Sequence, residues 1–304
     1  MSGEDAVRVD APTERRNPDT TDIDLLPTPD VLRLLNAEDR KVPDAVGEVL
    51  PRLAGAVDTA VDRLRAGGRV HYVGAGTSGR LAVLDAAELV PTYNAPEDWF
   101  VAHQAGGAAA FRQAVENAED DADAGASLVT SEVGEGDFVL GLTASGRTPF
   151  VVGALEQARR LGAGTALVSS NPERTATAPA DVVVAVDTGP EPITGSTRMK
   201  AGSAQKLVLT SFSTAVMVRL GRTYSNLMVS LVAANSKLRG RTSAILREAT
   251  GAGEQECADA LAAADGDLKT ALVHLLGGVS AERAGELVAA CDGHVRDALS
   301  SLRG

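Results

Sequence analysis

The stretch Arg69-Val-His-Tyr-Val-Gly-Ala-Gly-Thr-Ser-Gly-Arg80 decides how this chain of 304 residues folds. Its apolar first half predicts a short strand, and its glycine-rich second half predicts a tight turn followed by the start of a helix. Gly74, Gly76 and Gly79 allow the backbone to bend sharply and to approach a ligand closely. A turn of this kind also occurs as a plain strand–helix connection, so the stretch alone leaves ligand binding and a purely structural role open.

Two hydroxyl residues in this turn, Thr77 and Ser78, favour an anionic ligand. They take the position of a helix N-cap, where unpaired amide groups and the helix dipole both attract negative charge, and the added hydroxyls favour a phosphate monoester. The three glycines also match the dinucleotide fingerprint, which requires an acidic residue at the end of the second strand. Glu97 and Asp98 instead precede the next apolar run, so we place a nicotinamide cofactor well below a phosphorylated small molecule.

Composition and charge argue against several classes of partner. The hydrophobic content of 44% is enough for a core, whereas the net charge of −12 disfavours nucleic acid or an anionic membrane surface as the main partner. No apolar run is long enough to span a bilayer, and the N-terminus lacks the order of a signal peptide, so we expect a cytoplasmic protein. Two cysteines and four scattered histidines give no metal-ligand spacing, and we expect neither a metal nor another cofactor.

Five apolar runs alternate with helical patterns along the middle of the chain. Unalternating runs are typical of parallel strands that are covered on both faces. The rhythm predicts a doubly wound, mainly parallel α/β sheet, whose ligands bind beyond the carboxyl ends of its strands. The expected strands are residues 69–73, 99–103, 137–143, 165–169 and 181–186. The expected helices cover residues 78–89, 107–118, 149–161, 195–220, 225–239 and a further stretch toward residue 250.

The chain divides into four expected segments. Residues 1–27 are polar and are expected to be a flexible lead-in, whereas residues 28–68 form N-terminal helices that pack on the core. Residues 69–250 form the ligand-binding α/β domain with its long C-terminal helices. Residues 251–304 form a small all-helical tail, which carries an internal repeat of two helices joined by an Asp-Gly turn.

A second loop, Thr143-Ala-Ser-Gly-Arg-Thr148, repeats the logic of the first. A strand ends, small and hydroxyl residues follow, and a helix begins. Two such loops on adjacent strands can hold one substrate from two sides. Neither loop places a Lys before a Ser or Thr, as a nucleotide-binding loop of the Gly-Lys-Ser type requires. The ligand is therefore expected to carry its phosphate on a sugar-sized molecule.

Basic side chains near these loops are candidates for neutralising the phosphate. Most surface Arg and Lys side chains are simply solvated. Arg198 and Lys200, however, lie at the glycine-marked start of a long helix, where the dipole disfavours an unpaired cation. An anion bound there would remove the conflict. The other cations near the loops are Arg80, Arg147 and Lys206.

Two carboxylates are candidates for acid–base chemistry. Glu88 shares a helix face with Leu84 and Asp85, and desolvation in such a stripe would favour a protonated carboxyl that can donate a proton near neutral pH. An exposed Glu88 without a catalytic role is the alternative. Glu119 begins an acidic cluster typical of a solvated face, and Glu116 lies nearby. The residues alone do not choose between Glu119 and Glu116.

These motifs belong to longer segments that resemble the N-acetylmuramic acid 6-phosphate etherase family, whose core is similar to the sugar isomerase (SIS) domain of many phosphosugar enzymes and regulators. The resemblance extends from Asn17 into the helical tail, and the run Ser196-Thr-Arg-Met-Lys-Ala-Gly202 is its most specific part. The other matching segments are residues 74–80, 84–88, 91–93, 105–107, 114–120, 144–149, 194–195, 205–206 and 226–228.

The resemblance implies a lyase of amino-sugar recycling that cleaves the D-lactyl ether of the phosphorylated sugar. Elimination and then hydration would give N-acetylglucosamine 6-phosphate and D-lactate. The resemblance also implies that Glu88 is the proton donor, that Glu119 is the other acid–base residue, and that a homodimer has its pockets near the subunit interface. The residues that it implies for phosphate and sugar binding are Gly76, Thr77, Ser78, Gly79, Arg80, Ser145, Gly146, Arg147, Thr148, Ser196, Thr197, Arg198 and Lys200.

The chain departs from the family pattern at Ala87, Leu89, Val90 and Ala108, which keeps both glutamates but bears on the shape of the lactyl pocket. One alternative is a non-catalytic phosphosugar sensor of the glucokinase-regulatory type, although this chain has length for only one such domain and the tail. An aldose–ketose isomerase would share the phosphate loops. A sugar-responsive repressor would need a basic helix-turn-helix segment, and a glycosidase would not need loops built for a phosphate.

Overall fold

The computed structural model describes residues 11–113, 115–230 and 236–303. The first ten residues of the expected lead-in and position 114 of the resemblance lie outside these ranges. The chain forms two compact units, of which the first comprises Met1–Ala86 and Asp98–Phe212 and the second Ala87–Glu97 and Ser213–Gly304. The division between the two units falls inside two helices, α4 (Gly76–Tyr93) and α7 (Lys200–Arg219).

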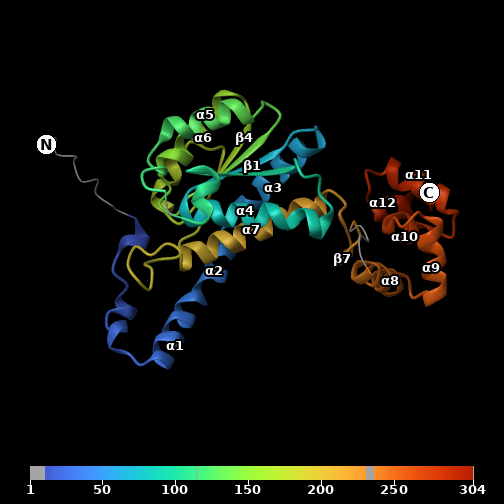
Figure 1. Ribbon diagram of the computed structural model, residues 1–304, viewed down its shortest axis with the longest axis horizontal. Coiled ribbons are helices and arrows are strands. Elements are labelled where there is room, and N and C mark those ends of the chain that lie inside the picture. Colours follow the sequence, from blue (N-terminus) through green and yellow to red (C-terminus); the bar gives the residue numbers. More distant parts are fainter. Residues whose placement is uncertain (1–10, 114, 231–235, 304) are drawn as a thin grey trace. The chain divides into compact units, whose positions relative to one another are not determined.

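A five-stranded parallel sheet forms the centre of the first unit (Figure 1), as the sequence predicts. The strand order is β2-β1-β3-β4-β5, so the chain moves outward in one direction from β1 to β2 and then crosses back to β3. This reversal makes β1 and β3 neighbours, and a reversal of strand order is where doubly wound sheets bind ligands. The strands are β1 (Val70–Gly74), β2 (Phe100–Gln104), β3 (Phe138–Leu142), β4 (Gly164–Ser169) and β5 (Val182–Ala185).

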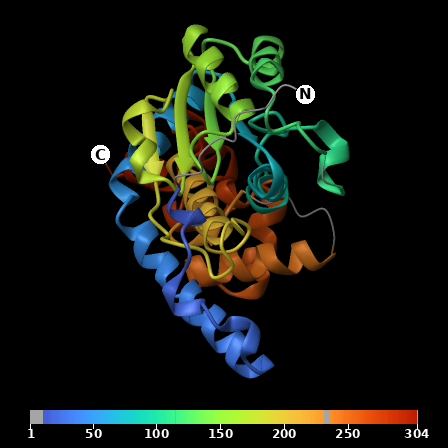
Figure 2. The same cartoon turned by 90° about the vertical axis from the view of Figure 1, so that its left-hand side faces the viewer.

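Helices cover both faces of the sheet (Figures 1 and 2). On one face the Phe212 ring lies 5.9 Å from the Phe138 ring and 6.2 Å from the Tyr72 ring, so α7 packs directly on β1 and β3. On the other face α5 and α6 pack against Val73, Val139 and Leu167. The helices of the first face are α3 (Leu50–Arg65), α4 (Gly76–Tyr93) and α7 (Lys200–Arg219), and those of the second are α5 (Ala122–Glu132) and α6 (Pro149–Arg160).

The segment before the first helix is held by specific contacts, although it was expected to be flexible. Residues 11–27 contain three short 3-10 helices, and Thr13, Asn17 and Thr20 are buried. The Thr20 hydroxyl donates to the Pro192 carbonyl oxygen at 2.8 Å, and the Thr13 carbonyl accepts from the Gly195 amide at 3.1 Å. Figure 2 shows the helices that follow, in blue: α1 (Thr28–Asp39) and α2 (Lys41–Gly47).

The segment between β2 and β3 differs from the expectation at two points. Residues 107–118 were expected to be helical, but Gly106 and Gly107 adopt left-handed backbone angles, and the described residues of this stretch form only the 3-10 helix Gly107–Phe111. The next helix, α5, was not expected, because an acidic run stands at its start. Asp121 caps this helix by accepting a hydrogen bond from the Ala124 amide at 2.8 Å.

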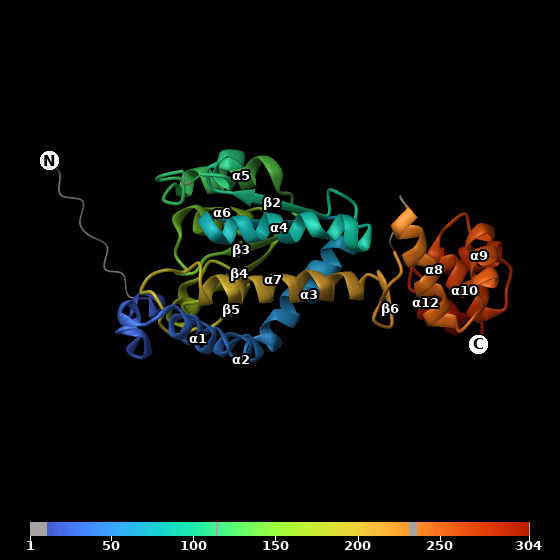
Figure 3. The same ribbon diagram turned by 60° about the horizontal axis from the view of Figure 1, so that its bottom comes forward.

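The second unit contains a short hairpin and a helical tail (Figure 3). The strands β6 (Thr223–Tyr224) and β7 (Leu227–Met228) pair where a helix over 225–239 was expected, and residues 231–235 of that helix lie outside the described residues. At the two turns of the expected repeat, Asp265-Gly266 and Asp292-Gly293 both take left-handed angles between helices. The helices are α8 (Ser236–Thr250), α9 (Glu254–Ala263), α10 (Leu268–Gly277), α11 (Ala281–Ala290) and α12 (Val295–Ser301).

Within the part of the chain that the structure describes, no helix combines the length and the apolar character needed to cross a membrane.

Candidate functional site

A cavity of about 250 Å³ lies at the carboxyl ends of β1 and β2. Three of the residues expected at the site line it: Gly76 and Arg80 from the first turns of α4, and Glu119 from the loop before α5. The other lining residues are Ala75, Gln104, Ala105, Ala110, Gln113, Val115, Glu116, Asn117 and Ala118. The cavity therefore joins the first predicted phosphate loop to one of the two predicted acid–base glutamates.

The turn from β1 into α4 is as tight as its glycines predict. A Cβ atom at Gly74 would lie 2.7 Å from the amide nitrogen of Gly79, so neither position has room for a side chain. The helix begins at Gly76, two residues earlier than expected, and Thr77 and Ser78 therefore lie in its first turn rather than at its N-cap. First-turn amides have no partner within their helix, so they remain suited to an anion.

Arg80 braces the wall of the cavity. Its guanidinium group donates to the carbonyl oxygens of Ala110 at 2.7 Å, Phe111 at 3.2 Å and Gln113 at 3.4 Å. These bonds hold the irregular segment after β2 against α4. Arg80 was expected to bind the phosphate directly, but several of its N–H groups donate hydrogen bonds to the backbone that shapes the cavity.

Gln104, at the last position of β2, is a residue that the sequence interpretation missed. Its side-chain nitrogen lies 3.4 Å from the Gly76 carbonyl oxygen and 3.5 Å from that of Ala110, while its buried side-chain oxygen has no hydrogen-bond partner among the described residues. The available signal was a polar residue at the carboxyl end of an otherwise apolar strand, which is where ligand-binding groups lie in such sheets.

The loop that carries Glu119 is attached to the start of α6. The Glu119 carbonyl oxygen accepts a hydrogen bond from the Phe150 amide at 3.0 Å. Asn117 adopts a left-handed backbone angle of 62°, which turns the chain between Glu116 and Glu119. Both glutamates are exposed and line the cavity, so the geometry of this unit alone does not separate them.

The second predicted loop follows β3, and the expected adjacency of the two loops is confirmed because β1 and β3 pair directly. Its hydroxyl groups are joined to one another, with 2.7 Å between the hydroxyl oxygens of Thr143 and Thr148 and 3.3 Å between those of Thr143 and Ser145. The Asn171 side chain donates to the Ser145 carbonyl oxygen at 3.0 Å and fixes the loop from β4. Gly146 takes a left-handed angle of 74°. Ser145, Gly146, Arg147 and Thr148 do not line the cavity described above.

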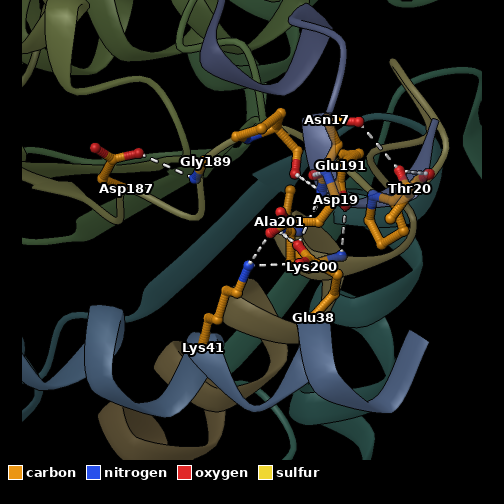
Figure 4. Close-up of polar contacts among 12 residues, drawn as sticks. Asn17, Asp19, Thr20, Glu38, Lys41, Asp187, Gly189, Glu191, Lys200 and Ala201 are labelled. Atoms are coloured by element: carbon orange, nitrogen blue, oxygen red, sulfur yellow. Dashed lines mark hydrogen bonds and ion pairs between the residues drawn. The ribbon is translucent and has the colours of Figure 1, made fainter. Parts of the chain in front are cut away.

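The third predicted segment, Ser196–Lys200, ends at the start of α7, and the anion expected there is supplied by the chain itself. The buried Glu191 carboxylate accepts from the amides of Lys200 at 2.8 Å and Ala201 at 2.9 Å. The Lys200 ammonium group is 1% exposed and donates to Glu38 at 2.7 Å (Figure 4). Lys200 therefore lies in an internal ion pair rather than at the cavity, and Ser196, Thr197 and Arg198 do not line the cavity either.

Glu88 is not among the residues that line this cavity. Glu88 is exposed, and Leu84, one turn earlier, is 55% exposed. The described residues of this chain therefore do not bury Glu88 in the way that its apolar neighbours on the helix face suggested.

A buried chain of polar groups lies near the amino ends of β1 and β3. His71 Nδ1 lies 2.9 Å from His103 Nε2, and His71 Nε2 lies 3.2 Å from Asp137 Oδ2. An ionised carboxylate only accepts, so His71 donates from Nε2 and accepts at Nδ1 from His103. His71 and His103 are 32 positions apart in the sequence, and parallel pairing of β1 and β2 brings them to one face of the sheet.

Acidification is expected to destabilise the fold through His71. Burial, with His103 beside it, lowers the pKa of His71 to about 4, whereas an unfolded histidine has a pKa of about 6.5. The unfolded chain therefore binds the extra proton between these values, and stability falls as the pH drops from about 6.5 toward 4. From pH 7 to pH 5 the loss should be about 2 kcal/mol, at about 1.4 kcal/mol per pKa unit.

The measurement is urea unfolding of wild type and His71→Gln at both pH values. Burial raises the pKa of Glu191, which acts in the opposite direction in the more acidic part of this range. The difference between the two proteins is therefore the informative quantity. Equal pH dependence in wild type and variant would contradict the assignment to His71.

Several known proteins are similar to this chain over most of its length. A family model described as the glucokinase regulatory protein N-terminal SIS domain matches residues 52–159. The chain is 61% identical over 271 residues to an N-acetylmuramic acid 6-phosphate etherase of Thermobifida fusca (strain YX), covering 88% of each chain. It is 51% identical to a relative of the same name from Cutibacterium acnes, covering 95% of each, and 47% identical to one from Pectobacterium atrosepticum, covering 98% and 99%. A solved phosphoheptose isomerase from Francisella tularensis matches with a TM-score of 0.48 and 21% identity, over 62% of this chain and 98% of that one.

Proposed function

The chain belongs to the N-acetylmuramic acid 6-phosphate etherase family, and from this premise we propose that its ether cleavage takes place in the cavity beside Glu119. The protein is a carbon–oxygen lyase that converts N-acetylmuramic acid 6-phosphate into N-acetylglucosamine 6-phosphate and D-lactate. The observation that carries the placement is the position of Glu119, which lines the cavity together with the start of α4 at the carboxyl ends of β1 and β2.

The chemistry proceeds by elimination and hydration. Opening of the sugar ring exposes an aldehyde at C1, which acidifies the hydrogen on C2. A base removes that hydrogen, the C2–C3 double bond forms, and the C3–oxygen bond breaks as an acid protonates the departing D-lactate. Water then adds across the double bond, returning a hydrogen to C2 and a hydroxyl group to C3. Two positioned proton-transfer groups are enough for these steps.

Glu88 and Glu119 supply these two groups in the proposal. Glu88 protonates the departing lactate, and Glu119 transfers the other proton. The phosphate is held by the loops after β1 and β3 and by the segment before α7. The proposed binding residues are Gly76, Thr77, Ser78, Gly79, Arg80, Ser145, Gly146, Arg147, Thr148, Ser196, Thr197 and Arg198. Lys200 is left out of direct contact because Glu38 holds its ammonium group.

A homodimer completes the site in this proposal. Glu88 and Leu84 form an exposed stripe on α4, and a second copy packed on this stripe would desolvate the glutamate. Exposed apolar side chains on the N-terminal arm, Leu25 at 77% and Leu32 at 61%, offer further surface for such an interface. The acidic composition is consistent with the cytoplasmic location that we propose.

The direct test is release of free D-lactate from N-acetylmuramic acid 6-phosphate, measured with a coupled D-lactate dehydrogenase. Interconversion of an aldose phosphate and a ketose phosphate without lactate release would instead indicate an isomerase. Binding of phosphosugar without turnover would indicate a sensor.

A further inference from the structure

Glu38 and Lys200 form the most deeply buried ion pair among the residues that the structure describes, and their side chains are 2% and 1% exposed. Glu38 Oε2 accepts from Lys200 Nζ at 2.7 Å and from the Asn17 amide nitrogen at 2.9 Å, and its other oxygen accepts from Lys41. Burial alone would raise the pKa of Glu38, but the hydrogen bonds from Lys200, Lys41 and Asn17 outweigh it and lower the pKa to about 2. Figure 4 shows how these groups converge on one carboxylate.

Lys200 is fixed at both ends. Its ammonium group donates to the Glu38 carboxylate, while its backbone amide donates to the Glu191 carboxylate at 2.8 Å. The lysine therefore ties helix α1 to the first residue of α7. A single side chain thus connects segments that are 162 positions apart.

The segment that Lys200 fixes lies close in space to Thr77, a residue of the first predicted phosphate loop. Residues Thr194–Met199 precede Lys200. The N-terminal segment holds this stretch and the residues just before it, because the Gly195 amide donates to the Thr13 carbonyl oxygen and the Thr20 hydroxyl donates to the Pro192 carbonyl oxygen. Two residues after Lys200, a Cβ atom at Gly202 would lie 3.5 Å from the Thr77 methyl group. The start of α7 thus lies beside the first turn of α4, which carries Thr77.

We infer that Lys200 is a positioning residue, which together with Glu38 fixes the Ser196–Arg198 segment against the first loop and acts on the substrate only through that segment. The inference rests on the proposed function, in which this segment binds the phosphosugar. It replaces the expectation that Lys200 neutralises the phosphate directly. The effect of either partner should therefore appear mainly in KM, because the acid–base groups are untouched.

A positioning role and a direct phosphate-binding role of Lys200 predict opposite orders for the increase in KM of the Glu38 and Lys200 variants. Lys200→Met leaves Glu38 with Lys41 and Asn17 as partners, whereas Glu38→Gln leaves a fully buried ammonium group without its carboxylate. A positioning pair therefore predicts that Glu38→Gln raises KM more, by about tenfold, and that Lys200→Met raises it by less than about threefold. The Glu38→Gln/Lys200→Met double variant should recover part of the loss of Glu38→Gln, because removing both charges of a buried pair costs less than removing one. A direct phosphate ligand predicts that Lys200→Met has the larger effect and that the double variant is no better.

The experiment measures KM and kcat for D-lactate release, equilibrium binding of N-acetylglucosamine 6-phosphate, and thermal midpoints for the three variants. Asp30→Asn is the matched control, because Asp30 lies on the same helix in an exposed pair with Arg33. A lower thermal midpoint with unchanged KM would overturn the inference, since the pair would then be only structural. A larger effect of Lys200→Met than of Glu38→Gln would also overturn it.

A second variant keeps the test decisive if Glu38→Gln does not fold. Thr20→Val removes the bond from Thr20 to the Pro192 carbonyl oxygen, four residues before Ser196, and a longer contact of 3.5 Å to the Asn17 carbonyl oxygen, while both side chains of the ion pair stay in place. It should raise KM several-fold at unchanged kcat, and an unchanged KM would overturn the inference. Failure of the wild-type protein to release D-lactate would refute the proposed function instead, so the two failures are distinguishable.

Discussion

Glu119→Gln should lower the rate of D-lactate release by about 10²–10⁴-fold, the usual contribution of one positioned acid–base group. Glutamine keeps the shape of the side chain but cannot take up the proton. The backbone bond between Glu119 and Phe150 does not involve the carboxylate, so the loop should keep its position. Binding of N-acetylglucosamine 6-phosphate should therefore persist, and isothermal titration calorimetry can measure it beside the rate.

Glu116→Gln is the matched comparison, because Glu116 lines the same cavity three residues earlier and is also exposed. Its rate should change far less than that of the Glu119 variant. The opposite order would transfer the catalytic role to Glu116. Full turnover by both variants would remove this loop from the mechanism.

Glu88→Gln should lower the rate to a similar extent, and mixing it with Glu119→Gln should restore activity. Glu88 does not line the cavity of its own chain, so we expect it to serve the site of a second copy. In a symmetric dimer, a subunit of each variant then forms one site with both glutamates intact and one site with neither. Random exchange gives such mixed dimers half of the time, and the expected activity is about one quarter of wild type.

Subunit exchange should be checked by light scattering and by a tagged subunit captured with its untagged partner. If the two variants remain monomeric when they are mixed, the proposed dimer would be contradicted. A mixed dimer that stays inactive would place both glutamates in one chain. The two results separate the oligomeric state from the composition of the site.

Local sequence signals predicted the sheet because each strand is an apolar run closed by small or hydroxyl residues. Because the loops after β1 and β3 share one composition, their adjacency could also be anticipated. The helix α5 was missed, since its start lies in an acidic run that reads as solvated until Asp121 is recognised as its cap. The helix expected over 107–118 fails for a related reason, because two left-handed glycines override the apolar spacing.

The partners of charged side chains could not be predicted, because they depend on contacts between distant segments. Arg80 and Lys200 were both expected to face a phosphate, yet one donates to three carbonyl oxygens and the other is enclosed by Glu38. Sequence spacing assigns a charge to a loop but does not identify what already neutralises it. The pairing of His71 with His103 escaped notice for the same reason, since it requires the register between two strands.

The bond between the Phe150 amide and the Glu119 carbonyl oxygen has a consequence for substrate choice. It couples α6, which follows the proposed second phosphate loop, to the peptide of Glu119, the proposed acid–base residue. In the proposed site, a sugar without its phosphate would leave that loop unoccupied. Such a sugar is therefore expected to lose turnover as well as affinity, because the binding energy of the phosphate would no longer support proton transfer at the reacting carbons.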